Sequence, residues 1–452
     1  MENRTMKRAA VILAAGMGTR MRSKKIKVLH EVGGRPMVDW SLALADGLGC
    51  DKRILVIGTH SEELRQVAAN RVGSENIAIQ DPPQGTGHAV QSAEQALVGF
   101  EGHVVVLYAD TPLLPVEAVE KAFASLDAGY AVSVLGFDAA EPGGYGRLIC
   151  SDEGDLLKIV EAKEASPEEL AVSFCNSGVM AVRSEYLFDL LSRVTNDNAK
   201  GEYYLTDVVE LARQDGLKAS AVRCSEEDVL GVNSREQLAE AEKVFQSKTR
   251  RKMMENGVTL IDPDTVYFAF DTQVGADVVI EPNVFFGPGV SVASDTRIKA
   301  FSHLENCSVG QACQIGPFAR LRPGAVLHAG VRVGNFVEIK NSELGEGVAA
   351  NHLSYIGDGD VGAKSNIGAG TIFCNYDGYF KHRTTIGEGS FIGSNSSLVA
   401  PVTLADGSFV GSGSVVTKDV PEGALAVGRG KQKNIEGWAD TYHAEMRRKK
   451  QS

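Results

Sequence analysis

The sequence contains little that would place the protein in a membrane or in an oxidising compartment. No apolar run approaches the ~18 residues of a membrane-spanning helix, and the N-terminus lacks the hydrophobic core of a signal peptide. The seven cysteines are scattered and odd in number, with no CxxC pair and no zinc-binding spacing. We therefore expect reduced thiols, a cytoplasmic location and no contact with a membrane.

Positive charge is outweighed by negative charge. The chain has 46 Lys and Arg against 58 Asp and Glu, a formal net charge of −12, which argues against a general affinity for nucleic acid. We interpret the basic run at residues 447–450 as a solvated tail. Apolar residues make up 43% of the 452 residues, which is ample for large cores, and the length suggests two to three domains.

What the sequence does contain is a long repeat of six residues. From about Val274 to Val416 an aliphatic or aromatic side chain occupies every sixth position, with few interruptions. This period fits neither an α-helix nor a single strand. It predicts coils of three short parallel strands with one inward side chain at each corner. Because a single coil cannot bury its own apolar face, the coils must stack into a β-helix.

The repeat resembles that of the hexapeptide acyltransferases, a family whose parallel β-helix is left-handed. The resemblance implies transfer of an acyl group from a CoA thioester to an amine or a hydroxyl. A rigid trimeric scaffold without catalysis is the alternative. The residues that interrupt the repeat must decide between the two.

The first half of the chain, residues 7 to about 228, alternates strand and helix signals. Short β-branched runs such as RAAVIL, RILVIG and HVVVLY predict strands, and helical stretches such as Pro36–Leu48, Glu62–Ala69 and Val116–Leu126 lie between them. This alternation predicts a Rossmann-like α/β fold with a mostly parallel sheet and with ligands at the carboxyl ends of its strands.

A connector separates this half from the repeat. Residues 234–256 contain neither Gly nor Pro, and Ser234 with Gln237 has the form of a capping box, so we expect one long helix. The expected domains are therefore an α/β domain over 7–231, a linker helix over 232–256, and a β-helix domain with a C-terminal tail over 257–452.

The first chemical motif is LAAGMGTR at residues 13–20, where a predicted strand runs into a Gly-rich turn with a cation at its end. Backbone N–H groups of such a turn can bind phosphates, and glycine permits a close approach. The turn lacks the third glycine of a dinucleotide fingerprint and the GK[ST] of a P-loop. Taken alone, it is also compatible with an ordinary strand–helix turn.

The motifs around this turn resemble the sugar-1-phosphate nucleotidyltransferases, whose signature is LAAGxGTR followed by PKVL. Ile26 stands where that family usually has Pro, and Ala109 stands where Gly is more usual. The resemblance continues through these segments: QGTGH at 84–88, YAD at 108–110, GYGR at 144–147, IVE at 159–161, NSG at 176–178 and GVN at 231–233.

The resemblance implies in-line attack of a sugar-1-phosphate oxygen on the α-phosphorus of UTP, with pyrophosphate leaving. The protein mainly positions and neutralises charge in such a transfer. Asp110 and Asn233 would hold Mg²⁺, which prefers oxygen ligands, while Lys27 and Arg20 would act catalytically by balancing charge. The nucleotide and sugar would contact Leu13, Ala14, Ala15, Gly16, Lys27, Gln80, Gly85, Thr86, Tyr108, Gly146, Glu161, Asn176 and Asn233.

Two of these residues would also suit purely structural roles. Asp110 could cap a helix beyond Pro112, and Lys27 could belong to a solvated run with Lys24 and Lys25. Either alternative stays open from the sequence alone.

Charged residues interrupt the hexapeptide repeat at a few places. Arg320 and Arg322 lie in one coil and Lys340 roughly one coil later, a stacking that suits a sugar phosphate but also occurs on solvated surfaces. Further along, an insertion that carries Lys381 breaks the repeat. Insertions in a solenoid often lie on its binding face.

Together the two halves resemble one family over nearly the whole chain, the bifunctional N-acetylglucosamine-1-phosphate uridyltransferases/glucosamine-1-phosphate N-acetyltransferases. The resemblance implies that acetyl-CoA acetylates glucosamine-1-phosphate. The product, N-acetylglucosamine-1-phosphate, would then receive UMP from UTP. It also implies a homotrimer whose acetyl sites lie where subunits meet.

The same resemblance assigns residues to the acetyl site. His352 would be the general base, because an amine attacks a thioester only when unprotonated and histidine titrates near neutral pH. The sugar phosphate would contact Arg322, Lys340, Tyr355, Asn366 and Lys381. The acetyl-CoA side of the same pocket would be lined by Asn375 and Tyr376, and the CoA channel by Ser394, Ser412 and Arg429.

Several alternatives remain. His352 would also suit a structural role, whereas a metal shared with His303 and His328 is disfavoured because the three occupy different hexad positions. The chain would also suit a nucleotidyltransferase whose β-helix only oligomerises, or a trimeric scaffold that is not an enzyme. Paired assays of acetyl transfer and pyrophosphate release separate these functions.

Overall fold

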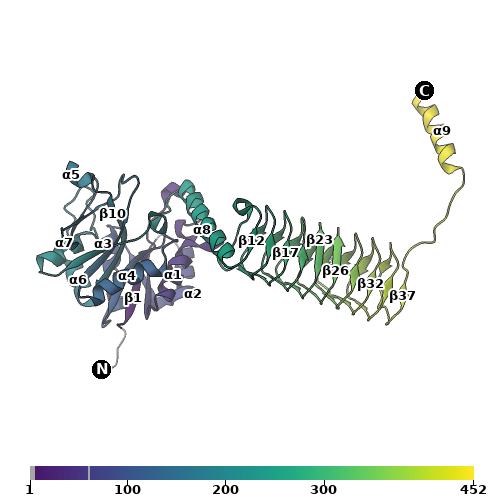
Figure 1. Ribbon diagram of the computed structural model, residues 1–452, viewed down its shortest axis with the longest axis horizontal. Helices are drawn as coiled ribbons and strands as arrows, with labels where there is room; N and C mark the ends of the chain where they lie inside the picture. Colours follow the sequence, from purple (N-terminus) through teal and green to yellow (C-terminus); the bar gives the residue numbers. More distant parts are fainter. Residues whose placement is uncertain (1–5, 60–61, 452) are drawn as a thin grey trace. The chain divides into compact units, whose positions relative to one another are not determined.

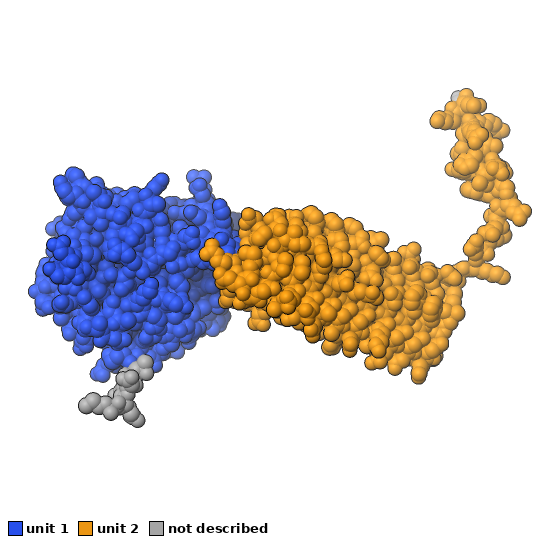
Figure 2. Space-filling view, in the orientation of Figure 1, with its two compact units in different colours: residues 1–248 blue, residues 249–452 orange. Residues whose placement is uncertain are grey.

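The chain folds into two compact units, residues 1–248 and residues 249–452 (Figure 2). They are seen in a computed structural model that describes residues 6–59 and 62–451. The boundary falls within α8 (Arg235–Glu255), in the segment where the sequence predicts a linker helix. Each unit has a hydrophobic core of its own.

The first unit is built on a nine-stranded sheet (Figure 1). Its strands are β1 (Arg8–Leu13), β4 (Lys52–Gly58), β5 (Ile77–Gln80), β6 (His103–Tyr108), β7 (Val132–Asp138), β8 (Arg147–Cys150), β9 (Leu156–Val160), β10 (Phe174–Arg183) and β11 (Ala219–Arg223). The main path runs β11-β7-β10-β6-β1-β4-β5, and every neighbour along it is parallel except β10. The predicted mostly parallel α/β sheet is confirmed.

Helices cover both faces of this sheet, because successive residues of a strand point to opposite sides. In β1, Ala10 and Ile12 pack on the side of α1, α2 and α4, while Ala9 and Val11 pack on the side of α3, α6 and α7. The helices are α1 (Met37–Gly47), α2 (Glu62–Val72), α3 (Thr86–Gln91), α4 (Val116–Asp127), α5 (Pro167–Leu170), α6 (Ser184–Ser192) and α7 (Asp207–Gln214). Burial on both faces explains why these strands read as continuous apolar runs.

The parallel strands β1, β5 and β6 end at the same edge of the sheet. The Gly-rich turn follows β1, Gln80 closes β5, and Asp110 follows β6. Ligands of open α/β sheets bind at this edge. The topology therefore brings motifs far apart in the sequence to one place.

The second unit is a left-handed parallel β-helix with three faces, as predicted (Figure 1). The first face has ten strands, β12 (Thr259–Leu260) to β37 (Leu425–Ala426). The second face has eight, β15 (Phe285–Phe286) to β36 (Val415–Val416), and the third also has eight, β13 (Gln273–Val274) to β34 (Val402–Leu404).

A few of these strands carry the residues of interest. On the first face they are β23 (Arg332–Asn335), β26 (Ala349–His352), β29 (Asn366–Ile367), β32 (Phe391–Ile392) and β35 (Phe409–Val410). On the second face they are β21 (Arg320–Leu321), β24 (Glu338–Lys340), β27 (Tyr355–Gly357) and β30 (Ile372–Cys374), and on the third face β28 (Gly359–Val361).

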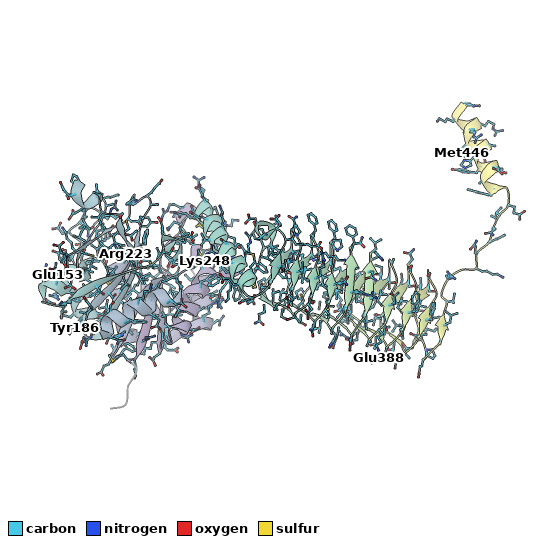
Figure 3. The ribbon with its side chains drawn as sticks, in the orientation of Figure 1. Glu153, Tyr186, Arg223, Lys248, Glu388 and Met446 are labelled. Atoms are coloured by element: carbon cyan, nitrogen blue, oxygen red, sulfur yellow. The ribbon has the colours of Figure 1, made fainter. Side chains whose placement is uncertain are left out.

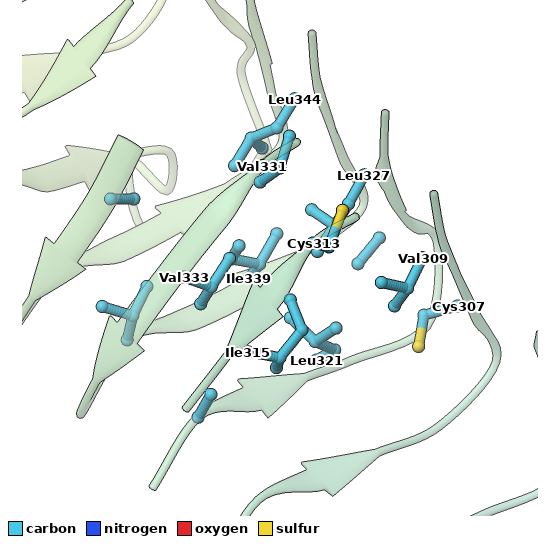
Figure 4. Close-up of a cluster of buried hydrophobic side chains, with 14 of the residues drawn as sticks. Cys307, Val309, Cys313, Ile315, Leu321, Leu327, Val331, Val333, Ile339 and Leu344 are labelled. Atoms are coloured by element: carbon cyan, nitrogen blue, oxygen red, sulfur yellow. The ribbon is translucent and has the colours of Figure 1, made fainter. Parts of the chain in front are cut away.

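The six-residue period fills the inside of the coils. Ile315, Leu321, Leu327, Val333 and Ile339 are six residues apart, and each is at most 2% exposed (Figure 4). Polar residues stand outward, as Glu388 does (Figure 3). The core of this unit is thus a column of aliphatic tiers that no single coil could form.

The corner that joins the first face to the second, here called the first corner, has a constant backbone conformation. In eight coils one residue at this corner has a φ between 50° and 75°, whether or not it is glycine, and Gly316, with φ +89°, is a further positive-φ residue in the coil of Phe318. The eight residues are Asn283, Phe301, Phe318, Phe336, Leu353, Gly370, Asn395 and Gly413. Such conformations are uncommon for side chains other than glycine, and here they recur because every coil makes the same turn.

The repeat runs slightly further than the sequence indicates. The six-residue period is visible in the sequence only to Val416, yet β37 pairs with β35 beyond that point, so the predicted end of the repeat was wrong. Ala424 and Ala426 take the inward positions there, and such small side chains do not show the aliphatic period. The tail ends in α9 (Trp438–Gln451), which has no buried residue. In the described parts of the chain, every helix is too short or too polar to cross a membrane.

Candidate active sites

The strand edge of the first unit contains a cavity around the Gly-rich turn. It is lined by Leu13, Ala14, Ala15, Gly16, Lys27, Val28, Gln80, Pro83, Gly85, Thr86, Ala89, Tyr108, Asp110 and Glu202. Apart from Val28, Pro83, Ala89 and Glu202, all of these are residues that the sequence predicts for the nucleotide or the metal. The fold therefore gathers the predicted residues from four separate segments of the chain.

Glycines shape this cavity in two ways. Gly18 has φ +61°, and a Cβ on it would lie 2.5 Å from Cβ of Lys27, so glycine lets the lysine side chain cross the turn. A Cβ on Gly16 would instead meet nothing nearer than Nζ of Lys27, at 4.0 Å. Gly16 thus leaves open space beside the lysine, where a ligand can approach the backbone.

Lys27 lies between the two predicted metal ligands. Its Nζ donates to Oδ2 of Asp110 at 2.5 Å and to Oδ1 of Asn233 at 3.1 Å, and its side chain is 9% exposed. The carboxylate and the amide oxygen therefore converge on a single cation. A donor set of this kind, completed by phosphates and water, fits a divalent metal such as Mg²⁺.

The backbone holds both metal-ligand candidates in place. The N–H of Val232 donates to the carbonyl of Asp110 at 2.8 Å. The N–H of Asn233 donates to Oε1 of Gln237 at 2.8 Å, and the N–H of Gln237 donates to Oγ of Ser234 at 3.2 Å. The expected capping box is therefore only half formed, because the side chain of Gln237 accepts the N–H of Asn233 rather than that of Ser234. That exchange anchors Asn233 at the start of α8.

The alternative roles of Asp110 and Lys27 do not agree with these contacts. The helix after Asp110 is α4, which is preceded by Pro115 and has no side-chain cap. Lys27 is buried and paired with Asp110, whereas Lys25 is exposed and pairs with Glu31.

The predicted sugar-binding residues lie on the neighbouring strands. The N–H of Asn176 donates to the carbonyl of Gly146 at 2.8 Å, and Gly178, with φ +91°, packs against the ring of Tyr108. Burial raises the pKa of Tyr108 well above its usual range, so it stays a neutral hydroxyl. Burial also raises the pKa of Glu161. Of these residues, only Tyr108 lines the cavity around the Gly-rich turn.

Three residues of this site differ from simple expectation. Arg20 is exposed on the short helix Thr19–Met21, away from the cavity lining. Ile26 keeps φ −60° and ψ 140°, the backbone that a proline would impose. Ala109 is fully buried, and its N–H donates to the carbonyl of Leu13 at 3.0 Å. Ile26 thus has the φ that a proline would have, and the side chain of Ala109 fits within the core.

In the second unit, the second face gathers a cluster of polar residues. The register pairs Leu321 with Ile339, which sets Arg322 beside Lys340 in adjacent coils. Arg322 donates to Oε1 of Glu338 at 2.8 Å. Nδ2 of Asn375 lies 3.4 Å from the hydroxyl of Tyr355. Arg322, Lys340, Tyr355 and Asn375 therefore form one group, here called the second-face cluster.

His352 lies on the first corner and is exposed. Its Nδ1 lies 2.9 Å from Oδ1 of Asn335, which is its neighbour in the preceding coil. An amide oxygen accepts, so this contact places the imidazole proton on Nδ1 and leaves the lone pair on Nε2. This is the form that a general base requires. Asn335 was not predicted, although coil-to-coil register would have indicated it.

The residues predicted for the CoA channel continue along the same corner. The strand register places Ala369, Ser394 and Ser412 at the positions equivalent to His352 in the next three coils. Parallel strands lie ~4.8 Å apart, so Ser412 is roughly 15 Å from His352. In the following coil Arg429 donates to the carbonyl of Ser412 at 2.7 Å.

Asp377 accepts several hydrogen bonds within the insertion after β30. Its carboxylate accepts the N–H groups of Tyr379 and Phe380, each at 2.7 Å, and contacts Nε2 of His382 at 2.7 Å. These hydrogen bonds, that of Phe380 first, lower the pKa of Asp377 to about 2. Lys381 lies 4.2 Å from the ring centroid of Tyr376, so its ammonium rests on the aromatic face.

One chain distributes the predicted acetyl-site residues over more than one face. The second-face cluster is on one face, Asn366 begins β29 on the first face, and the CoA-channel residues follow the first corner. The alternative of a metal shared by histidines is not supported: His303 belongs to the second face, and His328 contacts Glu343 on the third. Among the described residues, no cluster of three or more His, Cys, Asp or Glu suits a metal.

Comparison with known proteins gives matches in both units. Residues 10–197 match the family model of the MobA-like NTP transferase domain, and residues 306–341 and 383–418 match that of the bacterial transferase hexapeptide (six repeats).

Curated relatives match nearly the whole chain. The bifunctional protein GlmU of Hyphomonas neptunium is 57% identical over 438 residues, which cover 97% of this chain and 95% of the relative. That of Maricaulis maris is 56% identical over 443 residues, 98% of each chain. That of Caulobacter vibrioides is 54% identical over 437 residues, 97% of this chain and 95% of the relative.

Proposed function

Because the chain belongs to the family of bifunctional GlmU proteins, we propose that its two units divide the two reactions of UDP-N-acetylglucosamine synthesis between them. The enzyme acetylates glucosamine-1-phosphate with acetyl-CoA and transfers UMP from UTP to N-acetylglucosamine-1-phosphate. We assign uridyl transfer to the first unit and acetyl transfer to the second. The observation that supports this division is that each unit gathers its own set of converging charged and polar side chains.

In the first unit, the nucleotide would lie in the cavity at the strand edge, with its phosphates against Gly16. Mg²⁺ would be held by Asp110 and Asn233, where it would neutralise and orient the phosphates. Lys27 would leave these two oxygens and contact the phosphates instead. Arg20 would add a second positive charge from the exposed end of the turn. The protein's own contribution is then to align the attacking oxygen with the α-phosphorus and to balance charge.

In the second unit, glucosamine-1-phosphate would be held by Arg322, Lys340 and Tyr355 of the second-face cluster together with Asn366 and Lys381. Nε2 of His352 would take a proton from the sugar amine as the amine attacks the acetyl carbonyl. The N–C bond forms, the C–S bond breaks, and the proton passes on to the CoA sulfur. Tyr376, Ser394, Ser412 and Arg429 would lie along the CoA chain.

We further propose that the chain acts as a homotrimer. The residues assigned to the acetyl site lie on different faces of one β-helix, so a neighbouring subunit would complete each site. UTP and acetyl-CoA are metabolites of the cytoplasm, and the seven cysteines are free, which supports a cytoplasmic enzyme.

Two assays on the full-length protein test this proposal. Release of the CoA thiol is followed with acetyl-CoA and glucosamine-1-phosphate, and pyrophosphate release with UTP and N-acetylglucosamine-1-phosphate. Both signals are expected. Pyrophosphate release without thiol release would indicate that the β-helix only oligomerises. The absence of both signals would indicate that the chain is a scaffold.

A further inference from the structure

A buried carboxylate outside the predicted set lies beside the second-face cluster. Asp358 is 6% exposed and sits between β27 and β28, at the corner that joins the second face to the third. Its N–H donates to the carbonyl of Lys340 at 3.0 Å, and its carbonyl accepts the N–H of Thr384 at 3.1 Å. The backbone therefore fixes where this carboxylate points.

Three side chains converge on the Asp358 carboxylate. Nζ of Lys340 lies 3.3 Å from both oxygens, Nδ2 of Asn341 donates to Oδ1 at 2.7 Å, and Nδ2 of Asn375 donates to Oδ2. Because Asn375 also contacts the hydroxyl of Tyr355, three members of the second-face cluster are tied to one group. Burial alone would raise the pKa of Asp358, but the hydrogen bonds from Asn341, Asn375 and Lys340 lower it, so the carboxylate stays ionised.

We propose that Asp358 is a positioning residue for acetyl transfer, which holds the Lys340 ammonium where the phosphate of glucosamine-1-phosphate binds. The inference rests on the proposed function of the second unit. A lysine has four rotatable bonds and loses much rotamer freedom when it binds a ligand. In this protein Lys340 is already ordered by Asp358 before the substrate arrives.

The negative charge of Asp358 also repels a phosphate, so two effects oppose each other. Its charge is largely compensated, because one ammonium and two amide donors surround it. Removal of Asp358 would leave the Lys340 side chain less ordered, and no other group compensates for that loss. We therefore expect the positioning effect to dominate.

Asparagine cannot replace this aspartate without loss. Both carboxylate oxygens accept, whereas an amide accepts on one side and donates on the other. In Asp358→Asn the new NH₂ group would face either Asn341 or Asn375, both of which are donors here. One buried donor would lose its partner, and Lys340 would lose its counter-charge.

The test compares Asp358→Asn with a matched control, Asp360→Asn. Asp360 lies two residues further on, its side chain is 42% exposed, and it pairs with Arg383. In Asp358→Asn the KM for glucosamine-1-phosphate should rise about tenfold or more, or ~1.4 kcal/mol. The rate of uridyl transfer should stay within about twofold, and Asp360→Asn should match the wild type.

A double-mutant cycle then shows whether the effect passes through Lys340. In a Lys340→Met background, Asp358→Asn should raise that KM several-fold less than it does in the wild type. An undiminished rise would overturn the proposal, as would an unchanged KM or an equal rise in Asp360→Asn. A fall in kcat and melting temperature with KM unchanged would make Asp358 merely structural.

A second substitution covers the case in which Asp358→Asn does not fold. Asp358→Glu keeps the charge but displaces it, and the same rise in KM is expected; no rise would overturn the proposal. A wild-type protein that does not acetylate glucosamine-1-phosphate would overturn the proposed function and the positioning role with it. An active wild type with a silent Asp358→Asn would overturn the positioning role alone.

Discussion

At the scale of single residues, Asp110 is the acidic side chain on which the metal assignment depends. Asp110→Ala should lower uridyl transfer by roughly 10²–10³-fold, because the charge clamp on the phosphates is lost, and should leave acetyl transfer unchanged. Pyrophosphate release at limiting Mg²⁺ measures this. The control is Asp46→Ala, an exposed aspartate paired with Arg53, which should alter neither reaction. Near-normal pyrophosphate release by Asp110→Ala would make the metal assignment wrong.

Lys27 leads to a second residue-scale prediction, because its ammonium occupies the oxygens proposed for the metal. Lys27→Met should bind Mn²⁺ about tenfold more tightly in the absence of nucleotide, since no cation must be displaced and a like charge is gone. Calorimetric titration measures this binding directly. Uridyl transfer should nevertheless fall.

Lys25→Met provides the comparison for Lys27→Met. Lys25 is exposed and pairs with Glu31, so its loss should leave Mn²⁺ affinity unchanged. If both variants bound Mn²⁺ as the wild type does, the ammonium and the metal would not share a site.

His352 carries the third residue-scale prediction. His352→Ala should lower acetyl transfer by roughly 10²–10⁴-fold if its imidazole is the general base, while uridyl transfer stays intact. Acetyl transfer by the wild type should increase with pH. In His352→Ala, the part of this increase that depends on the imidazole should be absent when both proteins are measured with the same substrate.

The matched control for His352 is His328→Ala, which removes an exposed histidine from the third face. It should change neither rate nor pH profile. A His352→Ala protein with a raised KM but an unchanged kcat and pH profile would make His352 a binding residue instead.

At the scale of elements, the first turn of α7 contains an aspartate in an unfavourable place. Burial first, then Glu164, Glu210 and Glu161, raise the pKa of Asp207 to about 6, against about 3.9 in an unfolded chain. Between these values the folded state binds more protons, so the free energy of unfolding falls as pH rises. Asp207→Asn should therefore stabilise the first unit at pH 7 by about 1 kcal/mol after allowance for solvent screening, with no gain at pH 4.

Urea unfolding followed by tryptophan fluorescence tests this prediction, because Trp40 lies in the first unit and the other tryptophan, Trp438, lies in the tail. Asp215→Asn is the control that should have the opposite effect, since a hydrogen bond from Arg193 lowers the pKa of Asp215. This substitution should lower the free energy of unfolding of the first unit at pH 7. Equal stabilisation by both variants would contradict the assignment to Asp207.

The elements also show what the sequence could and could not predict. The parallel strands and the β-helix follow from periodicity, because burial repeats at fixed intervals along each segment. Two strands give no such signal. The antiparallel strand β10 lies in the sheet between β7 and β6, away from its place in the chain order, and alanines fill the core positions of the last strand, β37. Outward contacts such as Lys340–Asp358, 18 residues apart, depend on coil length and were missed.

At the scale of the whole molecule, the boundary within α8 predicts an independent first unit. A fragment of residues 1–248 should fold, remain monomeric and keep uridyl transfer. It retains Ala241 and Phe245, which pack against Val32, Met37 and Val232. Sedimentation and pyrophosphate release measure these properties.

A shorter fragment ending at Ser234 serves as the comparison. It removes Ala241 and Phe245 from that packed cluster, so it should unfold at lower urea concentration. An inactive or trimeric fragment of residues 1–248 would show that the first unit depends on the rest of the chain.

If the acyl donor binds along the first corner as proposed, the equivalent positions from His352 to Ser412, one in each coil, would measure its length. On the proposed assignment, CoA extends over several coils, and Arg429 contacts the end of CoA that lies farthest from His352. A short thioester such as an acetylated cysteamine reaches the histidine but not the arginine. On this assignment, donor selectivity would be set several coils from His352, and adding or deleting one coil would change it while leaving His352 in place.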